Sequence, residues 1–518
     1  MGLIPYKNEA YLDWSEAKNV EAMRAALADV GSRLDSSHPA IIGGKRVETD
    51  GEIVSVNPAN PSQVVGRTAS ATEREADMAL ETATSTFETW SRTSPEARAR
   101  ILLRASAIMK RRRFELLAWE AYEGGKPWAE ADAQVAEAID FLEYYAREML
   151  RLKDGVEIYA IPGEESRYSY QPMGVGVIIA PWNFPTAILT GMSSAAIVAG
   201  NTIIMKPSEF TPVIGAVVAE IFEEAGLPEG VLNFLPGYGS EVGDYLVQDA
   251  RTRFISFTGS MKTGLRINEL AARQIENQRW VKRVIAEMGG KDAMVIDDSA
   301  DLDSAAADIV KSAYGYSGQK CSAASRAILH ADVYDEVLGK VVEAARALEI
   351  GGPAEGGADV NVGPVISEPQ FDKVSGYVDA GKREGERVLG EDPGNPRNGY
   401  FVSPTIFEVD RDATVAREEI FGPVLSVIKA RDFDEALSVA NDSPYGLTGG
   451  VYSKNRDHLE RARQEFQAGN VYFNRGITGA LVGVQPFGGF GMSGTDSKAG
   501  GPDYLPLHML ARTVVERF

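Results

Sequence analysis

Short apolar runs alternate with helical patterns through the middle of the chain. Between residues 174 and 298, the runs GVGVIIA, NTIIMKP, GVLNFLPG, RFISFTGS and KDAMVIDD recur, and helical stretches separate most of them. A spacing of about 20 to 30 residues between successive runs is typical of strand–helix–strand crossovers. Because the runs lack strict polar alternation, we expect strands that are buried on both faces, as in a parallel sheet. The pattern predicts an α/β domain.

A second block of the same kind covers residues 322–473. Its apolar runs are SRAILHA, PTIFEV, PVLSVIKA, GGVYS and GNVYFN, and helical connectors are expected at 334–348 and 434–441. The stretch 351–398 is rich in glycine, proline, asparagine and aspartate, so it is predicted to carry surface loops. The block therefore predicts a second α/β domain.

The N-terminal part has a different character. Residues 73–152 are rich in alanine, leucine, glutamate and arginine, with apolar positions three and four apart, which predicts helices. We expect a helical N-terminal portion, two α/β domains and a short tail. A chain of 518 residues is long enough for two to four domains.

An uncharged stretch at 168–205 superficially resembles a membrane span. It is interrupted by three prolines and four glycines, which break a spanning helix. We therefore expect no membrane association. The stretch is predicted to form a strand at 174–180, a loop at 181–185, a helix at 186–199 and a strand at 202–206.

Composition and charge exclude several classes of protein. Apolar residues make up 44% of the chain and charged residues 25%, as in ordinary globular proteins. The formal charge of −21 repels a phosphate backbone, so nucleic acid is not an expected partner. One cysteine cannot form an internal disulfide, and the four histidines stand singly, so no metal site is predicted. The N-terminal residues do not resemble a targeting peptide, and the predicted location is cytoplasmic.

The single cysteine, Cys321, is a candidate nucleophile. It lies in YSGQKCSAASR, a polar segment of small residues between a predicted helix and a predicted strand. An accessible nucleophile belongs in such a segment, whereas a lone cysteine in other contexts is usually a small buried apolar residue. The neighbouring Lys320 could assist a thiolate by its charge.

Two further residues are candidates for catalysis. Glu287 is followed by two glycines in IAEMGGKD, which allows close backbone approach to a ligand. The alternative is a solvated carboxylate. Asn183 lies in PWNFP, where two prolines fix the loop, so its amide could donate to an oxyanion; a simple turn asparagine is the alternative.

Glycine-rich loops at predicted strand ends indicate a nucleotide site. FTGSMKTG (257–264) follows a predicted strand and precedes a helix, so its N–H groups and Ser260 could face a pyrophosphate. PGYGSEVG (236–243) is placed similarly. In KPSE, Lys206 and Glu209 come at the carboxyl end of a strand, where doubly wound sheets bind ligands and where both could reach ribose hydroxyls.

Seven motifs, in this order along the chain, resemble the aldehyde dehydrogenase superfamily. They are PWNFP (181–185), KPSE (206–209), FTGSMKTG (257–264), EMGGK (287–291), GQKCSAASR (318–326), EEIFGPV (418–424) and PFGGFGMSG (486–494). The resemblance implies an α/β fold with a Rossmann-type coenzyme domain, an α/β catalytic domain and a small β oligomerisation element. The implied bounds are 1–154 and 174–288 for the NAD-binding domain, 289–484 for the catalytic domain, and 155–173 and 485–518 for the oligomerisation element. Ala286 departs from the family's common leucine, which should alter packing but not chemistry.

The resemblance also implies roles for individual residues. Cys321 would be the nucleophile, Glu287 the general base, and Asn183 an oxyanion donor together with the Cys321 N–H. NAD is the implied cofactor. The residues implied to bind it are Ile179, Pro181, Trp182, Lys206, Ser208, Glu209, Gly239, Gly243, Thr258, Gly259, Ser260, Met288, Gly289, Glu419 and Phe421.

Within the family, GQKCSAASR and ITGALVGVQPFGG are similar to a branch that oxidises L-glutamate γ-semialdehyde, the open form of Δ1-pyrroline-5-carboxylate, to L-glutamate in proline degradation. The implied substrate-binding residues are Glu137, Phe184, Ser322, Gly479, Ala480 and Phe487. A turn at the Gly–Ala pair and core roles for the two phenylalanines are the alternatives. A homodimer or larger homo-oligomer is implied, and a proline dehydrogenase is a candidate partner, although the chain is too short to contain one.

Three other functions stay open at this point. The substrate could be another semialdehyde. A relative that passes the acyl group to coenzyme A typically lacks the base, so Glu287 opposes that reading. A binding or structural relative without catalysis is opposed by the joint presence of Cys321, Glu287 and Asn183.

Overall fold

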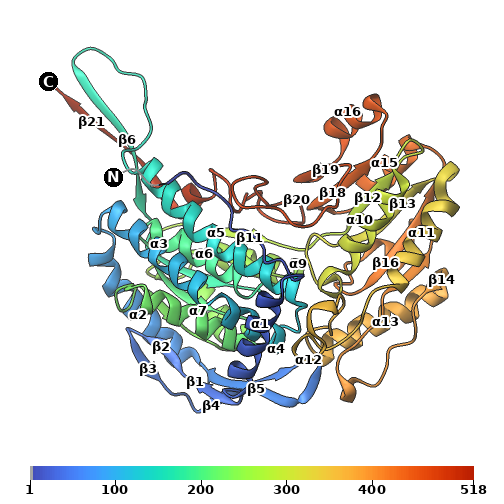
Figure 1. Ribbon diagram of the computed structural model, residues 1–518. Coiled ribbons are helices and arrows are strands. Elements are labelled where there is room, and N and C mark those ends of the chain that lie inside the picture. The colour runs from blue at the N-terminus through green and yellow to red at the C-terminus, as the bar shows by residue number, and fades with distance from the viewer. Residues whose placement is uncertain (1–3) are drawn as a thin grey trace.

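Two seven-stranded sheets with their helices form the two halves of the computed structural model, which describes residues 4–518 (Figure 1). The first sheet has the order β11-β10-β7-β8-β9-β2-β3. Its parallel strands are β7 (Val175–Ile179), β8 (Thr202–Lys206), β9 (Leu232–Phe234), β10 (Thr252–Thr258) and β11 (Arg283–Glu287), and β2 (Ala40–Ile42) and β3 (Lys45–Val47) complete it antiparallel. The chain moves from β7 to one side and returns to β10 on the other, so the strand order reverses between β7 and β10.

Helices pack on this sheet where the sequence predicts them. The strand, loop, helix and strand expected between 174 and 206 are confirmed. Most of the uncharged stretch is buried in β7, α6 and β8, whereas residues 168–172 lie in a partly exposed strand. The helical prediction for 73–152 is also confirmed. The helices of this half are α1 (Ala17–Gly31), α2 (Glu73–Trp90), α3 (Pro95–Arg111), α4 (Arg113–Tyr122), α5 (Trp128–Leu152), α6 (Ala187–Val198), α7 (Pro212–Glu224), α8 (Asp244–Gln248) and α9 (Met261–Ala272). Among the described residues, no helix is both long enough and apolar enough to cross a membrane.

The N-terminal portion is not only helical, which corrects the sequence expectation. Residues 36–70 form five strands, three of which, β1 (Ser36–His38), β5 (Asn60–Ser70) and β4 (Gly51–Asn57), make a separate sheet. β1, β2 and β3 have only three residues each, and the longer β5 is interrupted by Gly66, so no sustained alternation stands out in the sequence.

The second sheet has the order β14-β15-β16-β13-β12-β18-β19. All five predicted runs of this block are strands, and both predicted helical connectors are helices. The elements are β12 (Asp292–Ile296), α10 (Leu302–Tyr314), β13 (Ala324–His330), α11 (Tyr334–Arg346), α12 (Pro353–Gly356), α13 (Glu368–Glu384), β14 (Glu386–Leu389), β15 (Thr405–Glu408), α14 (Thr414–Arg417), β16 (Val424–Ala430), α15 (Phe433–Asn441), β17 (Tyr445–Gly446), β18 (Thr448–Tyr452), α16 (Arg456–Glu465), β19 (Asn470–Phe473) and β20 (Phe490–Gly491).

One segment of this half differs from the prediction. The stretch 351–398 carries loops, but it also contains the 17-residue helix α13. Ser367 caps that helix by accepting from the Gln370 N–H, and a proline lies in its first turn. Phe371, Val374 and Val378 repeat at helical spacing on its buried face. The high turn-residue content of the flanks concealed this local signal.

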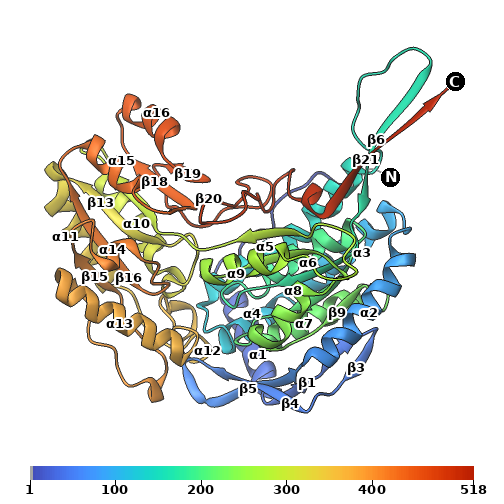
Figure 2. The ribbon, with the colours of Figure 1, turned by 180° about the vertical axis from the view of Figure 1, so that it is seen from behind.

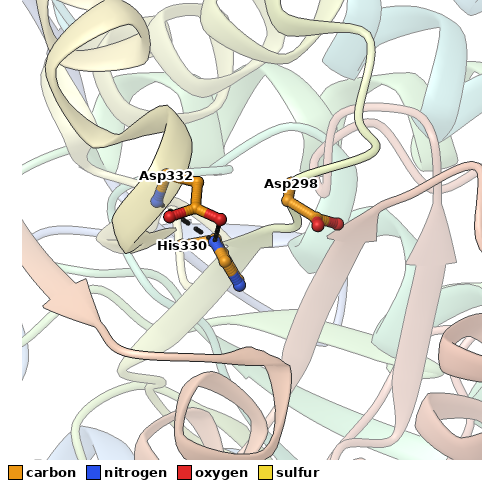
Figure 3. A group of neighbouring side chains, drawn as sticks. All are labelled: Asp298, His330 and Asp332. Atoms are coloured by element: carbon orange, nitrogen blue, oxygen red, sulfur yellow. Dashed lines mark hydrogen bonds and ion pairs between the residues drawn. The ribbon is translucent and has the colours of Figure 1, made fainter.

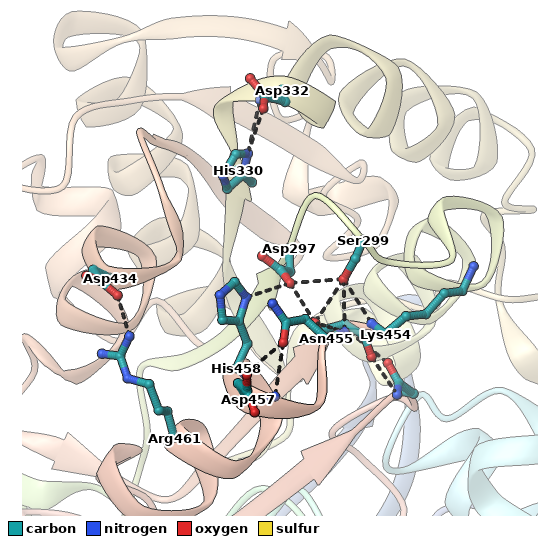
Figure 4. A network of polar contacts seen from close by, with 12 residues as sticks. Asp297, Ser299, His330, Asp332, Asp434, Lys454, Asn455, Asp457, His458 and Arg461 are labelled. Carbon is teal, nitrogen blue, oxygen red and sulfur yellow. Dashed lines mark hydrogen bonds and ion pairs between the residues drawn. The ribbon is translucent and has the colours of Figure 1, made fainter.

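A polar network fixes the loops at the carboxyl ends of β12 and β18 (Figure 4). The buried Asp297 carboxylate accepts from Ser453 Oγ at 2.5 Å and contacts His458 Nδ1 at 2.9 Å. Ser299 Oγ contacts Ser453 Oγ at 3.0 Å, and the His458 ring stacks on Phe433 with centroids 4.2 Å apart. These contacts join α16 to the carboxyl end of the second sheet, whereas Cys321 precedes β13 at the opposite end.

A two-stranded arm projects from the first half of the molecule, as Figures 1 and 2 show. It consists of β6 (Glu164–Pro172) paired antiparallel with β21 (Met509–Arg517). Val514 and Val515 on this arm are 46% and 54% exposed. The arm falls inside the segments predicted for oligomerisation. The predicted division into domains stays a prediction, and its first three residues lie outside the described part of the chain.

Candidate active site

The carboxyl ends of four parallel strands lie side by side at one edge of the first sheet. Ile179 at the end of β7 is in register with Lys206 at the end of β8 and with Phe257 of β10, and Thr258 is in register with Glu287 at the end of β11. Parallel strands bring their carboxyl ends to one edge, and the reversal of strand order between β7 and β10 leaves room there for a ligand. Glu287 thus ends a strand, which sequence reasoning had not predicted.

Cys321 lies in a strained loop between α10 and β13. Tyr316, Ser317 and Gly318 all have positive φ values of 51°, 55° and 68°. Such backbone is costly for residues with side chains and is often found near functional sites. The loop is held from several sides: Ser317 Oγ donates to the Gly363 carbonyl at 2.7 Å, and the Gln319 amide nitrogen donates to the Pro364 carbonyl at 3.2 Å.

Two cavities meet at Cys321. A cavity of about 140 Å³ lies on the side of α5 and is lined by Cys321 and Glu287. A second cavity of about 150 Å³ lies on the side of the strand ends and is lined by Cys321 and Asn183. Thr258 and Met288 line both. The thiol is therefore reachable from two directions, as a reaction between two bound molecules requires.

All the residues expected to bind substrate line the first cavity: Glu137, Phe184, Ser322, Gly479, Ala480 and Phe487. Gly479 has φ of 76°, a conformation that favours glycine, and no other atom lies within 4 Å of where its Cβ would be. Sequence reasoning missed other lining residues, among them Tyr11, Glu130, Asp140, Tyr145 and Tyr504. Three of these, Glu130, Asp140 and Tyr145, lie in α5, one to about two helical turns from Glu137, which is the signal that could have found them.

The residues expected to bind the cofactor divide into two groups. The second cavity is lined by Pro181, Trp182, Thr258, Gly259, Ser260, Met288, Gly289, Glu419 and Phe421. The others do not line it but lie at or beyond the ends of neighbouring strands: Ile179, Lys206, Ser208, Glu209, Gly239 and Gly243. Sequence reasoning missed Gln370 and Lys373, which line the second cavity from α13.

Several features of the second cavity fit a dinucleotide. A Cβ on Gly289 would collide with the Glu419 carboxylate, so this glycine gives the close approach that its motif suggested. Ser260 caps α9 by accepting from the Thr263 N–H at 3.3 Å, which places a helix N-terminus beside the cavity. Trp182 and Phe421 meet edge to face, with ring centroids 5.3 Å apart, and present apolar surface to the cavity.

Burial raises the pKa of Glu287 to about 7. Ser497 Oγ donates to its carboxylate at 2.9 Å, and Lys498 adds a favourable charge, but neither offsets the loss of water. The C-terminal segment supplies both residues and pairs with the end of β11 through a bridge between Glu287 and Gly494. A carboxylate with a pKa near 7 is suited to accept a proton at neutral pH.

The surroundings of Cys321 disfavour its thiolate in the absence of ligands. Burial raises the thiol pKa well above its ordinary value, and the carboxylates of Asp292, Glu287 and Glu419 add to the shift. Lys320 does not compensate, because its Nζ pairs with Glu130 at 2.6 Å. The prediction that Lys320 assists the thiolate is therefore wrong for this conformation, because its ammonium group forms an ion pair with Glu130 on α5.

Asn183 is 4% exposed and faces the nucleophile loop. Its Nδ2 donates to the Gln319 carbonyl at 3.1 Å, two residues before Cys321. An amide nitrogen carries two N–H donors, so one remains for an oxyanion. Thr186, three residues later, is held by a hydrogen bond from its Oγ1 to the buried Glu120 carboxylate. The PWNFP loop is thus anchored by its asparagine and by the threonine that directly follows it.

A group of possible metal ligands lies elsewhere, at the outer end of the second sheet (Figure 3). It contains His330 at the end of β13 and two exposed aspartates, Asp298 and Asp332. Sequence spacing did not suggest it, because Asp298 comes from the loop after the neighbouring strand β12. His330 Nδ1 already accepts from the Asp332 N–H at 3.2 Å, so an ordinary turn explains much of the arrangement.

Comparison with known proteins identifies the family. The aldehyde dehydrogenase family matches residues 46–514. The chain belongs to the aldehyde dehydrogenase family. Its sequence is 57% identical over 515 residues to a 1-pyrroline-5-carboxylate dehydrogenase of Geobacillus thermodenitrificans, covering 99% of both chains. The predicted family and its predicted branch are confirmed.

Solved structures agree with this assignment and confirm the predicted fold. A 1-pyrroline-5-carboxylate dehydrogenase from Thermus with bound NAD is 53% identical, with a TM-score of 0.98 and 100% of both chains covered. Proline utilization A from Bdellovibrio bacteriovorus is 44% identical with a TM-score of 0.97; the match covers 99% of this chain and 53% of that longer one.

Proposed function

We propose that this aldehyde dehydrogenase oxidises L-glutamate γ-semialdehyde to L-glutamate with NAD. The observation that carries the proposal is the position of Cys321, with a substrate-sized cavity on one side and a cavity suited to a dinucleotide on the other. The names of the relatives support the substrate, and the NAD-bound Thermus structure supports the cofactor.

The chemistry begins with attack of Cys321 Sγ on the aldehyde carbon. The Asn183 amide, with its second N–H, and the Cys321 backbone N–H would stabilise the alkoxide of the resulting thiohemiacetal; one such donor is typically worth about 3–4 kcal/mol. Because burial raises the pKa of the ligand-free thiol, its proton must leave during or before attack, and it would pass to water in the cavity that Glu287 also lines. Glu287 then remains free to act as a base in the later hydrolysis. The chemistry that NAD supplies when bound is acceptance of a hydride, which leaves an acyl thioester on Cys321.

Glu287 then serves as general base for hydrolysis. It removes a proton from a water molecule, which attacks the thioester carbonyl, and the Cys321 thiol and the carboxylic acid product are released. Its pKa of about 7 leaves roughly half of the carboxylate charged at neutral pH. The same base opposes transfer of the acyl group to coenzyme A as the main outcome.

NAD would bind along the aligned strand ends. Pro181, Trp182, Ser260 and Gly289 would contact it in the second cavity. Beyond that cavity, the buried Lys206 ends β8 and the half-buried Glu209 follows it, and both would hold the adenosine ribose.

The substrate would lie with its aliphatic stem between the Phe184 and Phe487 rings, which line the first cavity. Its α-carboxylate would accept hydrogen bonds from Ser322 and from the N–H groups of Gly479 and Ala480. Glu137 also lines that cavity and would face the α-ammonium group. Succinate semialdehyde lacks the ammonium group, and butyraldehyde lacks both charged groups.

A panel of aldehydes tests the proposed substrate. With saturating NAD, kcat/KM for butyraldehyde should be about 30- to 150-fold below that for glutamate γ-semialdehyde, because unmatched polar groups in the site cost at least 2–3 kcal/mol. If butyraldehyde came within threefold, the substrate assignment would fail, while the aldehyde dehydrogenase activity itself would stand. Addition of coenzyme A should not raise the rate.

The assembly and the domain division are also part of the proposal. The exposed valines of the arm, Val514 and Val515, and the neighbouring exposed Tyr159 would be covered by a second copy of the chain. We assign 1–154 and 174–288 to NAD binding, 289–484 to catalysis, and 155–173 and 485–518 to assembly. A cytoplasmic location and a proline dehydrogenase that delivers the substrate complete the proposed role.

A further inference from the structure

A buried lysine lies directly behind the proposed substrate cavity. Lys126, in the turn between α4 and α5, has no exposed surface. Among residues 4–518, no hydrogen-bond partner of its Nζ is found. Lysine is almost never fully buried without a partner, because its ammonium group loses the solvation of water. An explanation for this residue must therefore come from what its ammonium group contacts.

The contacts of the Lys126 ammonium group are two aromatic faces. Its Nζ lies 4.0 Å from the centroid of the Phe184 ring and 4.4 Å from the centroid of the Tyr316 ring. Both distances are well within the range of cation–π attraction, which is stronger where water is excluded. Phe184 lines the substrate cavity, and Tyr316 begins the left-handed run that leads to Cys321. The ammonium group thus bridges the substrate clamp and the nucleophile loop.

The turn that carries Lys126 and the adjoining end of α4 each make one further contact with the same parts. The Tyr316 hydroxyl donates to the Gly124 carbonyl at 2.9 Å. The Glu120 carboxylate, at the end of α4, holds Thr186 next to the PWNFP loop. The end of α4 and the turn after it therefore support both loops of the active site on the side away from the cavity. Of their residues named here, Lys126 is the one that contacts a ring lining the substrate cavity, that of Phe184.

We propose that Lys126 is a positioning residue that holds the Phe184 ring against the substrate stem and at a fixed position relative to the Cys321 loop. It does so through the charge of its ammonium group rather than through the volume of its side chain. The inference rests on the proposed function, since it assumes that Phe184 grips the stem of the semialdehyde. A loosened ring should weaken binding of a substrate with a long stem. It should leave a two-carbon aldehyde nearly unaffected, because that molecule has no stem to grip.

The charge of Lys126 should make this grip sensitive to pH. Burial lowers the pKa of its ammonium group to about 8, and the charge of Lys320 lowers it further. The carboxylates of Glu120 on α4 and of Glu130 and Glu137 on α5 act in the opposite direction and raise it. As the pH rises through 8, the ammonium group loses its proton and the cation–π contacts are lost. Because the pKa of arginine lies above 12, the Lys126→Arg variant should stay charged over the same range.

The experiment compares Lys126→Met, Lys126→Arg and the wild-type enzyme in steady-state assays with NAD. We expect Lys126→Met to raise KM for glutamate γ-semialdehyde about tenfold, with kcat, KM for NAD and KM for acetaldehyde within threefold. Wild-type KM for the semialdehyde should rise between pH 7 and pH 9, whereas that of Lys126→Arg should stay level. Lys282→Met is the matched control: this buried lysine donates to the Val247 carbonyl at 2.7 Å, outside both cavities, and its loss should not change KM.

The outcomes separate the two proposals. If the wild-type enzyme does not oxidise the semialdehyde, the proposed function fails. If it does, but Lys126→Met leaves KM unchanged or raises KM for acetaldehyde equally, Lys126 does not act through the clamp. Where Lys126→Met does not fold, the pH profile of Lys126→Arg decides: a rise in KM that persists in this variant overturns the inference.

Discussion

Replacing Glu287 by glutamine should slow steady-state turnover and stabilise the protein at the same time. Glu287 is half-buried at the end of β11, and loss of solvation raises the pKa of its carboxylate from the ordinary 4.5 to about 7. A pKa that is higher in the folded chain than in the unfolded chain means that the folded chain binds more protons between those two values. Stability is therefore lost as the pH rises from 4.5 to 7, and the loss persists above pH 7.

The size of the two effects follows from the same shift. A change from 4.5 to about 7 corresponds to about 3 kcal/mol of destabilisation by the charged carboxylate at pH 8. Glu287→Gln keeps the shape and can still accept from Ser497, so its free energy of unfolding should exceed the wild-type value by up to that amount at pH 8 and match it near pH 4. Loss of a general base should slow thioester hydrolysis by about 10²- to 10⁴-fold.

Two measurements check this prediction. Urea denaturation at several pH values gives the difference in the free energy of unfolding, and stopped-flow absorbance should show a burst of NADH followed by a slow steady state. The exposed Glu343 on α11 supplies a control, because Glu343→Gln should change neither quantity. A Glu287→Gln variant without a burst, or without a pH-dependent gain in stability, would refute the assignment of Glu287 as a buried base.

Other predictions concern the nucleophile, the cofactor and the assembly. Cys321→Ala should retain NAD binding by calorimetry but keep less than about one-hundredth of the wild-type rate of NADH formation, because the chain has no other thiol. Glu209 should repel a 2′-phosphate, so kcat/KM with NADP should fall below that with NAD, and an equal or higher value would move the ribose site elsewhere. Val515→Asp on the exposed face of the arm should shift sedimentation towards the monomer at micromolar concentration; a monomeric wild-type protein would contradict the proposed interface.

Much of the fold followed from local pattern. The five runs between 174 and 298 became strands because each is mainly apolar and lies next to glycine, proline or asparagine on at least one side, which suits a strand that is buried on both faces. The motif residues were recognisable for a similar reason. Asn183, Cys321 and Gly479 lie in loops whose backbone requires particular residues, so the sequence carries their signature.

Tertiary structure decided what depends on contacts between distant segments. The residues 36–70 form strands because other parts of the first half cover them, and α13 contributes Lys373 to the second cavity only because the chain folds back there. The pKa of Glu287 rises because the C-terminal segment buries it, and Lys320 is bound to Glu130 rather than to the thiol. Lys126 acquires two aromatic neighbours from positions 58 and 190 residues away. Burial and electrostatics are sums over such distant neighbours, and no local pattern in the sequence contains them.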